Sequence, residues 1–494
     1  MSTTFQNIIG GKRQDAHSGK TFQNINPATG ELLGTFPLSD ETDVEAAVSA
    51  ARTAFEHWRL VPAPKRGEIL FRVGELLSRY KEDLARIMTR EMGKVLKETR
   101  GDVQEGIDMA YYMAGEGRRL FGYTVPVELP NKSGMALRDP VGVVACITPW
   151  NFPVAIPTWK MFPALIAGNT IVLKPASDTP QSAFRLVEIL HEAGIPEGVV
   201  NIVFGSGQTV GEALIHHPDV SIISFTGSTE SGRHVAVEAA KSLKRVSLEM
   251  GGKNAIIVMD DADLELAVEG ILWSAYGTTG QRCTACSRLI IHQDVYEKLL
   301  TLLIPRIEKL RLGNGLDEAS DVGPVINKRQ LESIHEYVKI GQSEGASLVI
   351  GGKPATEGEL SKGFFYQPTL FKDVKPDMRI AKEEIFGPVL SAIKVASFEE
   401  AIAVNNDTKY GLSSAIYTQN VNRVQQAVRD ITTGILYVNS GTTGAEIQFP
   451  FGGTRGTGNG HREAGIAGLD VFTEWKVVYT DYSGKLQKAQ IDNQ

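Results

Sequence analysis

Short runs of β-branched residues alternate with helix-like segments from Val141 onwards, and this alternation constrains the fold more than any other feature. Such runs cover residues 143–147, 170–173 and 199–204, and a helical pattern over 181–193 separates the last two. Strands that alternate with helices form parallel sheets, because each helical crossover returns the chain to the same end of the sheet. The sequence therefore predicts an α/β fold.

A second alternating series begins at 254–259 and continues to about residue 438, so we expect two α/β units. Ahead of the first unit, apolar residues recur at helical spacing over 44–58. A longer helix is predicted over 64–92, with Pro64 in its first turn and Gly93 after its end. A chain of 494 residues also exceeds one ordinary core, which favours two or three domains.

Composition excludes several classes of partner. The net charge of -7 gives no broad attraction to nucleic acid or to an anionic membrane, so we expect a small-molecule partner. The most apolar stretch, 141–173, contains Lys160 and several prolines, which argues against a membrane helix. The histidines show no metal-ligand spacing, and no metal site is expected.

The cysteines indicate a reducing environment. Cys146, Cys283 and Cys286 form an odd and sparse set, which argues against a disulfide framework. Cys146 falls in an apolar run and is expected in the core. The first fourteen residues lack the apolar centre of a signal peptide, so we expect a cytoplasmic location.

Cys283 occupies a polar segment, 280–288, between a helix-like run over 263–276 and a strand-like run over 289–292. A thiol placed in such a loop is positioned like a nucleophile, which needs an oxyanion donor and a base nearby. Three other segments supply such groups: 149–153 with the amide of Asn151, 246–253 with the carboxylate of Glu249, and 383–388 with Glu384 and Phe386.

These four segments together resemble the aldehyde dehydrogenase superfamily, and the resemblance runs from about Phe22 to Tyr482. It implies an aldehyde dehydrogenase-like fold that assembles as a homodimer or homotetramer. The implied parts are a Rossmann-type cofactor domain (1–121 and 141–251), a second α/β catalytic domain (252–449), a β-arm for oligomerisation with its tail (122–140 and 470–494), and a segment returning to the cofactor domain (450–469).

The resemblance also implies catalytic roles. The Cys283 thiolate would add to the aldehyde carbon, while the Asn151 amide and the Cys283 backbone N–H stabilise the alkoxide. Loss of hydride to NADP or NAD would leave a thioester, and Glu249 would activate the water that cleaves it. Two alternatives stay open: Glu249 could cap the turn that follows it, and Cys286 could be the nucleophile or an oxidation partner of Cys283.

The cofactor segments carry weaker signals. Residues 205–211 have the spacing GxGxxxG, one residue longer than the dinucleotide fingerprint, and alone would suit an ordinary strand–helix turn. Ser228 could equally be a plain helix N-cap, and Glu384 a solvated surface carboxylate. The resemblance assigns cofactor contacts to the following residues: Trp150, Lys174, Ser177, Gly207, Gly211, Thr226, Gly227, Ser228, Glu384 and Phe386.

Ser177 bears on the choice of cofactor. It stands three residues after Lys174, where a glutamate would chelate the ribose hydroxyls and repel a 2′-phosphate. A small neutral serine leaves room for that phosphate beside Lys174, so we expect NADP to be tolerated or preferred. Family members without the glutamate also use NAD, and the choice stays open.

Arg282, together with 444–447 and 450–453, resembles the branches that oxidise semialdehydes such as α-ketoglutaric and α-aminoadipic semialdehyde. An arginine beside the pocket would hold a substrate carboxylate through two hydrogen bonds, unless it forms a structural ion pair. Two other functions compete: a CoA-acylating enzyme, which typically lacks the water-activating glutamate, and a non-enzymatic protein on the same fold. The latter should have lost Cys283, Asn151 or Glu249, and the chain keeps all three.

Overall fold

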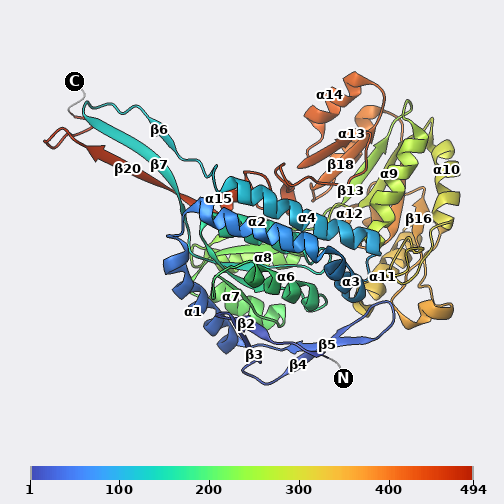
Figure 1. The fold of residues 1–494 in the computed structure, drawn as a ribbon. Helices are drawn as coiled ribbons and strands as arrows, with labels where there is room; N and C mark the ends of the chain where they lie inside the picture. Colours follow the sequence, from blue (N-terminus) through green and yellow to red (C-terminus); the bar gives the residue numbers. More distant parts are fainter. Residues whose placement is uncertain (1–2, 492–494) are drawn as a thin grey trace.

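Two α/β bodies and a projecting arm make up the molecule (Figure 1). The computed structural model describes residues 3–491 of the chain. Each body contains a seven-stranded sheet, and two three-stranded sheets complete the fold. These sheets confirm the α/β prediction, while the exact domain boundaries stay a prediction.

The first large sheet has the strand order β12-β11-β8-β9-β10-β2-β3. Strands β12 to β10 in this order are parallel, and β2 and β3 extend one edge in antiparallel fashion. The chain adds β9 and β10 on one side of β8 and then β11 and β12 on the other, so the order in which strands are added reverses at β8. The strands are β2 (Asn7–Ile9), β3 (Lys12–Gln14), β8 (Val143–Ile147), β9 (Thr170–Lys174), β10 (Val200–Ile202), β11 (Val220–Thr226) and β12 (Arg245–Glu249).

Helices cover both faces of this sheet because successive residues of its strands point to opposite faces. In β8, Val144 and Cys146 pack with α5 and α6, whereas Val143 and Ala145 pack with α1 and α8. Cys146 is therefore a core residue, as predicted. The helices are α1 (Glu41–Trp58), α2 (Ala63–Arg79), α3 (Lys81–Met92), α4 (Leu96–Glu116), α5 (Ala155–Ala167), α6 (Pro180–Glu192), α7 (Glu212–His216) and α8 (Thr229–Ala240), with a π-helical turn at Gly207–Gly211.

The single helix predicted over 64–92 is wrong, because the chain forms two helices, α2 and α3, that meet at Tyr80. Tyr80 leaves the helical region with φ -96° and ψ 12°. Its hydroxyl donates to Glu192 and its ring stacks under Arg185, both on α6. This tertiary packing overrides the local helical pattern. The predicted end is confirmed: Gly93 follows α3 with φ 93°.

The second large sheet has the order β15-β16-β17-β14-β13-β18-β19 and is parallel except for β15. Its strands are β13 (Asn254–Val258), β14 (Cys286–His292), β15 (Ser347–Ile350), β16 (Thr369–Lys372), β17 (Val389–Val395), β18 (Ser413–Tyr417) and β19 (Ile435–Val438). Helices α9 (Leu264–Tyr276) and α10 (Tyr296–Glu308) cover one face. The other face packs against α11 (Lys328–Ser343), α12 (Arg379–Lys382), α13 (Phe398–Asn406) and α14 (Val421–Asp430).

The arm is an antiparallel sheet of order β20-β7-β6 that extends away from both bodies (Figure 1). It unites the two β-rich segments that the sequence places far apart, β6 (Tyr123–Val125) and β7 (Lys132–Pro140) with β20 (Thr473–Asp481). The remaining elements are β1 (Thr3–Thr4), β4 (Thr21–Ile25), β5 (Leu32–Pro37), α15 (Gly468–Phe472) and short 3₁₀ turns at Gly277–Gly280, Gly358–Lys362 and Arg455–Thr457. Within residues 3–491, no helix has both the length and the apolar character needed to cross a membrane.

Candidate active site

The carboxyl ends of β8, β11 and β12 meet where the strand order of the first sheet reverses. The loop after β8 carries Trp150 and Asn151, β11 ends at Thr226, and β12 ends at Glu249. A crevice opens at such a reversal in parallel sheets, because neighbouring crossovers leave in opposite directions. The fold therefore brings these segments to one edge.

The loop with Cys283 comes from the second body. Helix α9 ends at Tyr276, and the following turn holds Thr278 and Thr279 at φ 53° and 57°, an unusual conformation for β-branched residues. Strand β14 begins at Cys286, earlier than the predicted 289, so the loop is short. The Asn254 side chain donates to the Cys283 carbonyl at 2.7 Å. Strained backbone of this kind persists only where surrounding contacts fix it, which is typical of functional sites.

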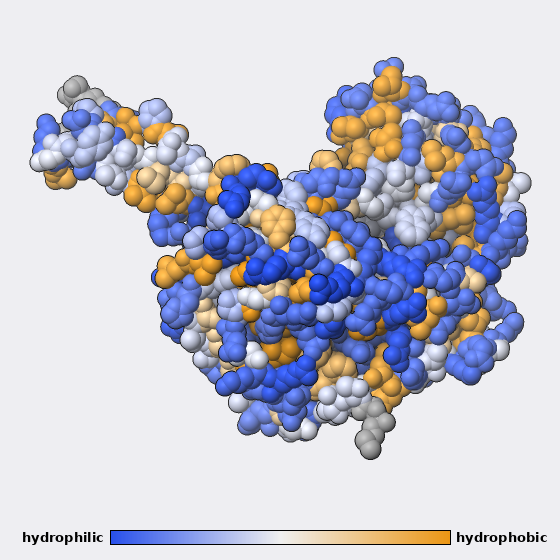
Figure 2. Space-filling model, viewed as in Figure 1, coloured by the Kyte–Doolittle hydropathy of each residue, from blue (hydrophilic) through white to orange (hydrophobic). Residues whose placement is uncertain are grey.

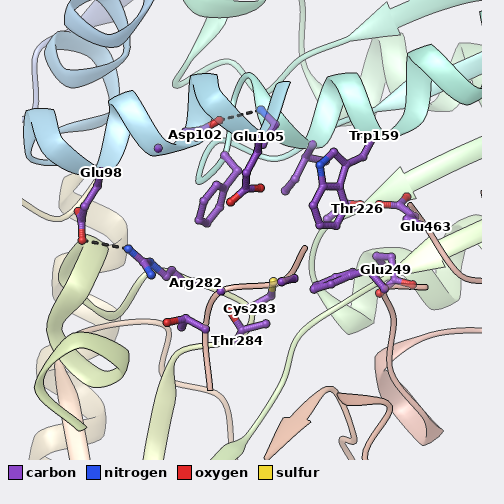
Figure 3. Close-up of a pocket in the computed structure, with 18 of the residues that line it drawn as sticks. Glu98, Asp102, Glu105, Trp159, Thr226, Glu249, Arg282, Cys283, Thr284 and Glu463 are labelled. Atoms are coloured by element: carbon purple, nitrogen blue, oxygen red, sulfur yellow. Dashed lines mark hydrogen bonds and ion pairs between the residues drawn. The ribbon is translucent and has the colours of Figure 1, made fainter. Parts of the chain in front are cut away.

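Cys283 and Glu249 line one cavity of about 230 Å³ (Figure 3). The Cys283 thiol is partly exposed. Burial raises its pKa to about 12, and the carboxylates of Glu249 and Glu384 add to the effect. The sulfur is therefore a thiol at neutral pH, and it needs a base before it can attack a carbonyl.

Glu249 has the properties of such a base. Burial raises the pKa of its carboxyl well above the ordinary value, and the nearby charge of Glu463 contributes. Among residues 3–491, neither carboxylate oxygen has a hydrogen-bond partner. The sequence alternative, a cap on the following turn, is wrong, because the Gly252 N–H donates to Glu384 instead, at 2.9 Å.

Sequence reasoning missed a buried pair beside Glu249. Glu463, from the segment that follows the second body, forms an ion pair with Lys160 of α5, which also donates to Ser224 at 3.2 Å. Figure 3 shows Glu463 and Glu249 together on one side of Cys283. A lysine in an apolar run does signal a buried anionic partner, but the sequence does not say which one.

Asn151 is tied to the nucleophile loop. Its amide donates one N–H to the carbonyl of Gln281 at 3.1 Å, two residues before Cys283. The side chain is 4% exposed and does not itself line the cavity. One amide proton is thus used to join the two loops, and the second is free for another acceptor.

Arg282 forms the ion pair that was the alternative to substrate binding. Its guanidinium contacts Glu98 of α4 at 3.0 Å and donates to the Thr278 hydroxyl at 2.8 Å. It also stacks over Trp273, at 4.6 Å from the ring centroid. Arg282 nevertheless lines the cavity. The N–H groups that do not bind Glu98 or Thr278 can therefore still contact a substrate.

Glu105 is a further cavity residue that the sequence did not indicate. It points from α4 into the cavity (Figure 3). Burial raises the pKa of its carboxyl to about 8, with a second contribution from Asp102. Glu98, Asp102 and Glu105 share one helical face by spacing, yet this pattern equally suits a solvated face.

Cys286 lies outside the cavity. Its thiol is 2% exposed and donates to the Arg288 carbonyl at 3.3 Å. Burial raises its pKa to about 12. These contacts favour Cys283 over Cys286 as the nucleophile.

The candidate cofactor residues of the first body lie close together. The Ser177 hydroxyl donates to the Gly205 carbonyl at 3.3 Å, which joins the loop after β9 to the glycine-rich turn. A Cβ atom added at Gly207 or Gly211 would meet nothing within 4 Å. The turn forms a π-helical segment rather than the regular helix start that was expected. Lys174 donates to the Pro175 carbonyl, and burial lowers its pKa to about 8.

Ser228 caps α8, as its alternative reading predicted, by accepting a hydrogen bond from the Ser231 N–H at 3.2 Å. It remains exposed at the start of a 12-residue helix, so neighbouring amides also face outward. The Thr226 hydroxyl next to Gly227 is buried, and it has no hydrogen-bond partner among the described residues.

Glu384 and Phe386 complete this edge from the second body. Glu384 is partly buried rather than solvated, and burial raises its pKa to about 7. Phe386 has φ 56°, and its ring meets Trp150 edge-on at 5.3 Å between centroids. Open space over the glycines, an exposed helix start and an unpartnered hydroxyl together fit a dinucleotide. The residues present therefore fit the expected cofactor.

A cluster of Asp260, His292 and Asp294 lies away from the cavity. Asp260, His292 and Asp294 offer ligand atoms within 4.8 Å of one another. The Asp260 carboxylate is already paired with Arg423 at 2.5 Å. Nothing else at this cluster points to a metal ion.

Fold and site together define a class, an α/β protein whose crevice fits a dinucleotide and whose adjoining cavity holds a free thiol. The model of the aldehyde dehydrogenase family matches residues 14–478. An α-ketoglutarate semialdehyde dehydrogenase of Haloferax volcanii is 43% identical over 98% of this chain and 100% of its own, and an α-ketoglutaric semialdehyde dehydrogenase of Bacillus subtilis is 41% identical over 96% and 98%. A betaine aldehyde dehydrogenase structure from Staphylococcus aureus in complex with NAD+ has a TM-score of 0.95 at 34% identity, over 97% and 96% of the two chains.

The chain belongs to the aldehyde dehydrogenase family. It is accordingly an enzyme that oxidises an aldehyde with NAD or NADP. The expected aldehyde dehydrogenase-like fold is confirmed, and the non-enzymatic alternative is excluded.

Proposed function

We propose that the chain oxidises a carboxylated semialdehyde at Cys283, with Glu249 as the base and Asn151 as an oxyanion donor. One observation carries this proposal. A single cavity unites the Cys283 thiol with the Glu249 carboxylate, whose oxygens lack partners among the described residues, and with the Arg282 guanidinium. The first two groups supply the chemistry and the third a contact for an anionic tail.

The reaction starts with a proton transfer. Because the Cys283 thiol has a raised pKa, Glu249 accepts its proton as the sulfur adds to the aldehyde carbon. The carbonyl oxygen becomes an alkoxide, which accepts hydrogen bonds from the free Asn151 N–H and the Cys283 backbone N–H. When bound, the nicotinamide cofactor supplies the hydride acceptor.

Hydrolysis of the Cys283 thioester completes the cycle. Glu249 first releases the thiol proton to solvent; its carboxylate then removes a proton from water, and the water oxygen adds to the thioester carbon. The carbon–sulfur bond then breaks and releases the carboxylic acid. A carboxylate with a raised pKa and no hydrogen-bond partner among residues 3–491 suits this task, because no contact competes with water for its lone pairs. This property favours water over CoA as the acceptor of the acyl group.

For the cofactor, we propose contacts from Lys174 and Ser177 to the adenosine ribose and from Ser228 and its neighbouring amides to the pyrophosphate. Gly207, Gly211, Thr226 and Gly227 line the path between them. Trp150, Glu384 and Phe386 would hold the nicotinamide end. Ser177 is small and neutral, which leaves room for a 2′-phosphate, so NADP should be accepted at least as well as NAD.

The substrate class rests on Arg282 and on the two α-ketoglutarate semialdehyde relatives. A semialdehyde with a distal carboxylate would place its aldehyde at Cys283 and its carboxylate at the Arg282 N–H groups that Glu98 leaves free.

The arm suggests self-association into a homodimer or homotetramer. Several apolar or aromatic side chains of the arm are more than half exposed, among them Val125 (59%), Trp475 (51%), Val477 (56%) and Tyr479 (65%). Figure 2 shows hydrophobic residues along the arm. Because contiguous exposed apolar surface favours association, we propose that 122–140 and 470–494 form the oligomerisation arm. We also propose a cytoplasmic location, since all three cysteines are free.

A panel of aldehydes tests the proposed function. NADH and NADPH production should be measured with carboxylated and plain aliphatic aldehydes, each with and without CoA. We expect higher kcat/KM for carboxylated substrates, no dependence on CoA, and turnover with NADP. Equal kcat/KM for both substrate types would contradict the Arg282 contact, and a requirement for CoA would contradict hydrolysis by Glu249.

A further inference from the structure

Asn151 and Cys283 belong to different sheets. Asn151 lies in the loop after β8 of the first sheet, and Cys283 lies in the loop before β14 of the second. Neither sheet alone fixes the distance between the amide and the sulfur. The proposed reaction needs that distance to be correct to a fraction of an ångström, because an oxyanion donor acts only where the charge develops. Some other element must hold the two loops together.

Helix α4 contacts the Asn151 loop through a buried ion pair. Lys94 Nζ lies 2.8 Å from Asp102 Oδ2, and both side chains are fully buried. The other carboxylate oxygen of Asp102 accepts the N–H of Ala155 at 2.7 Å. Lys94 Nζ also lies 3.4 Å from the ring centroid of Phe152, the residue after Asn151. The pair therefore holds this loop at two points.

The same helix contacts the Cys283 loop one turn earlier. Glu98 Oε1 accepts the Thr278 N–H at 2.8 Å and the Arg282 guanidinium at 3.0 Å. Glu98 and Asp102 are four residues apart, so they lie on one face of α4. One rigid helical turn thus spans both loops, as Figure 3 shows for Glu98 and Asp102.

We propose that Lys94, Glu98 and Asp102, here named the α4 charge cluster, are positioning residues that set the Asn151 amide relative to the Cys283 sulfur. The inference rests on the proposed function of these two groups. The cluster acts through the two loops: both oxygens of Asp102 and the bonded oxygen of Glu98 are committed to protein donors.

The double variant Lys94→Met/Asp102→Asn tests the Asn151 side of the cluster. It removes both charges together, so neither is left buried without a partner. We expect kcat to fall about 100-fold, as for a misplaced donor, while KM for the aldehyde and Kd for the nucleotide change by less than about threefold. Asp108→Asn, at an exposed acidic position on the same helix, is the matched control and should leave kcat unchanged.

Alkylation of Cys283 by iodoacetamide separates positioning from general damage. This displacement at carbon forms no oxyanion, so its rate should stay within about twofold of the wild-type rate in the double variant. A kcat close to wild type would overturn the proposal. A parallel fall in kcat, nucleotide affinity and alkylation rate would overturn it as well, because it would show an ordinary structural role.

Phe152→Leu keeps the proposal testable if the double variant fails to fold. It removes the ring that Lys94 faces but leaves the Lys94–Asp102 pair intact. We expect kcat to fall about tenfold at unchanged nucleotide affinity, since one of the two contacts to the loop is lost. Unchanged kcat would contradict positioning through Phe152. Failure of either test would leave wild-type aldehyde oxidation, and hence the proposed function, untouched.

Discussion

The carboxylates of Glu249 and Asp102, on opposite sides of the catalytic cavity, differ in whether a hydrogen-bond donor or cation pairs with them. On the β12 side, the Glu249 carboxylate lacks any hydrogen-bond partner within residues 3–491, and burial raises its pKa. On the α4 side, Lys94 is paired with Asp102, and Arg282 with Glu98. An unpaired buried carboxylate costs folding free energy but stays available for proton transfer, whereas a paired one holds backbone in place. The difference assigns chemistry to one side and positioning to the other.

The largest expected effect on kcat comes from removing the Cys283 sulfur, which lies between the two sides of the cavity. Cys283→Ala should lower kcat by at least about 10⁴-fold, as for removal of other covalent nucleophiles, while nucleotide binding persists. Cys286→Ala is the matched control and should retain turnover, because its thiol lies outside the cavity. Steady-state kinetics and nucleotide titration check both. Retained turnover in Cys283→Ala would move the chemistry to another residue.

The second-largest effect on the rate is expected for Glu249→Gln, which removes the unpaired carboxylate. We expect one equivalent of reduced cofactor in a burst, accumulation of the thioester, and a steady-state rate lower by about 10²- to 10³-fold. Mass spectrometry of the quenched enzyme detects the acyl group. An unchanged steady-state rate would remove Glu249 from the hydrolytic step.

The free energy of unfolding should not fall in the Glu249→Gln variant. A carboxyl whose folded pKa is raised stabilises the fold fully below its unfolded pKa, near 4.5, and loses this contribution as pH rises through the folded pKa. At higher pH the buried charge opposes folding, and a neutral amide removes that cost. Urea unfolding of Glu249→Gln at mildly alkaline pH should therefore give a free energy equal to or above that of the wild type. A clear loss of stability would show a partner for Glu249 that the contacts do not reveal.

On the α4 side, removing one charged side chain should lower the free energy of unfolding. Lys94→Met leaves the Asp102 carboxylate buried without its cation, so the free energy of unfolding should fall by about 3 kcal/mol. The double variant Lys94→Met/Asp102→Asn should recover most of this loss, because both charges are then absent. Urea unfolding measures all three proteins. Equal stability of the single and double variants would mean that the pair does not act as a unit.

The sequence predicted the unpaired side better than the paired side. Asn151 follows strand β8, Glu249 ends strand β12 and Cys283 precedes strand β14. Each is a residue type that its proposed chemistry requires, so the sequence motifs around them were recognisable. Glu98 and Asp102 of the α4 charge cluster lie on an amphipathic helix, where acidic residues at spacings of three and four most often face solvent, and Lys94 precedes that helix. Its burial depends on tertiary packing of α4 against α5 and the nucleophile loop, which no local pattern encodes.

Two other features that the sequence did not predict have the same origin. The break at Tyr80 arises from contacts with α6, and the ion pair of Glu463 with Lys160 joins residues 303 positions apart. Both depend on distant partners. The position of β8 and the end of α3, in contrast, followed from local rules: β8 shows a fully buried apolar run, and Gly93 takes the left-handed conformation after α3.

The smallest expected effect concerns Glu105, which belongs to the α4 side and lines the cavity. Its pKa is raised to about 8 by burial and by Asp102, while Lys94 and Arg282 act in the opposite direction. Below that pKa the side chain is a neutral acid, and above it a carboxylate faces the cavity. A carboxylated aldehyde should then be repelled, whereas a plain aldehyde should not.

The ratio of kcat/KM for carboxylated over plain aldehydes should thus fall roughly tenfold between about pH 7 and about pH 9, the size expected for two charges at partly solvated separation. Because both substrates use Cys283 and Glu249, the titration of those groups cancels in the ratio. Glu105→Gln should make the ratio independent of pH, and Asp108→Asn should not. A ratio that does not change with pH in the wild type would show that Glu105 does not face the carboxylate of the substrate. Arg282 would then be the only residue of the α4 side that is proposed to contact this carboxylate.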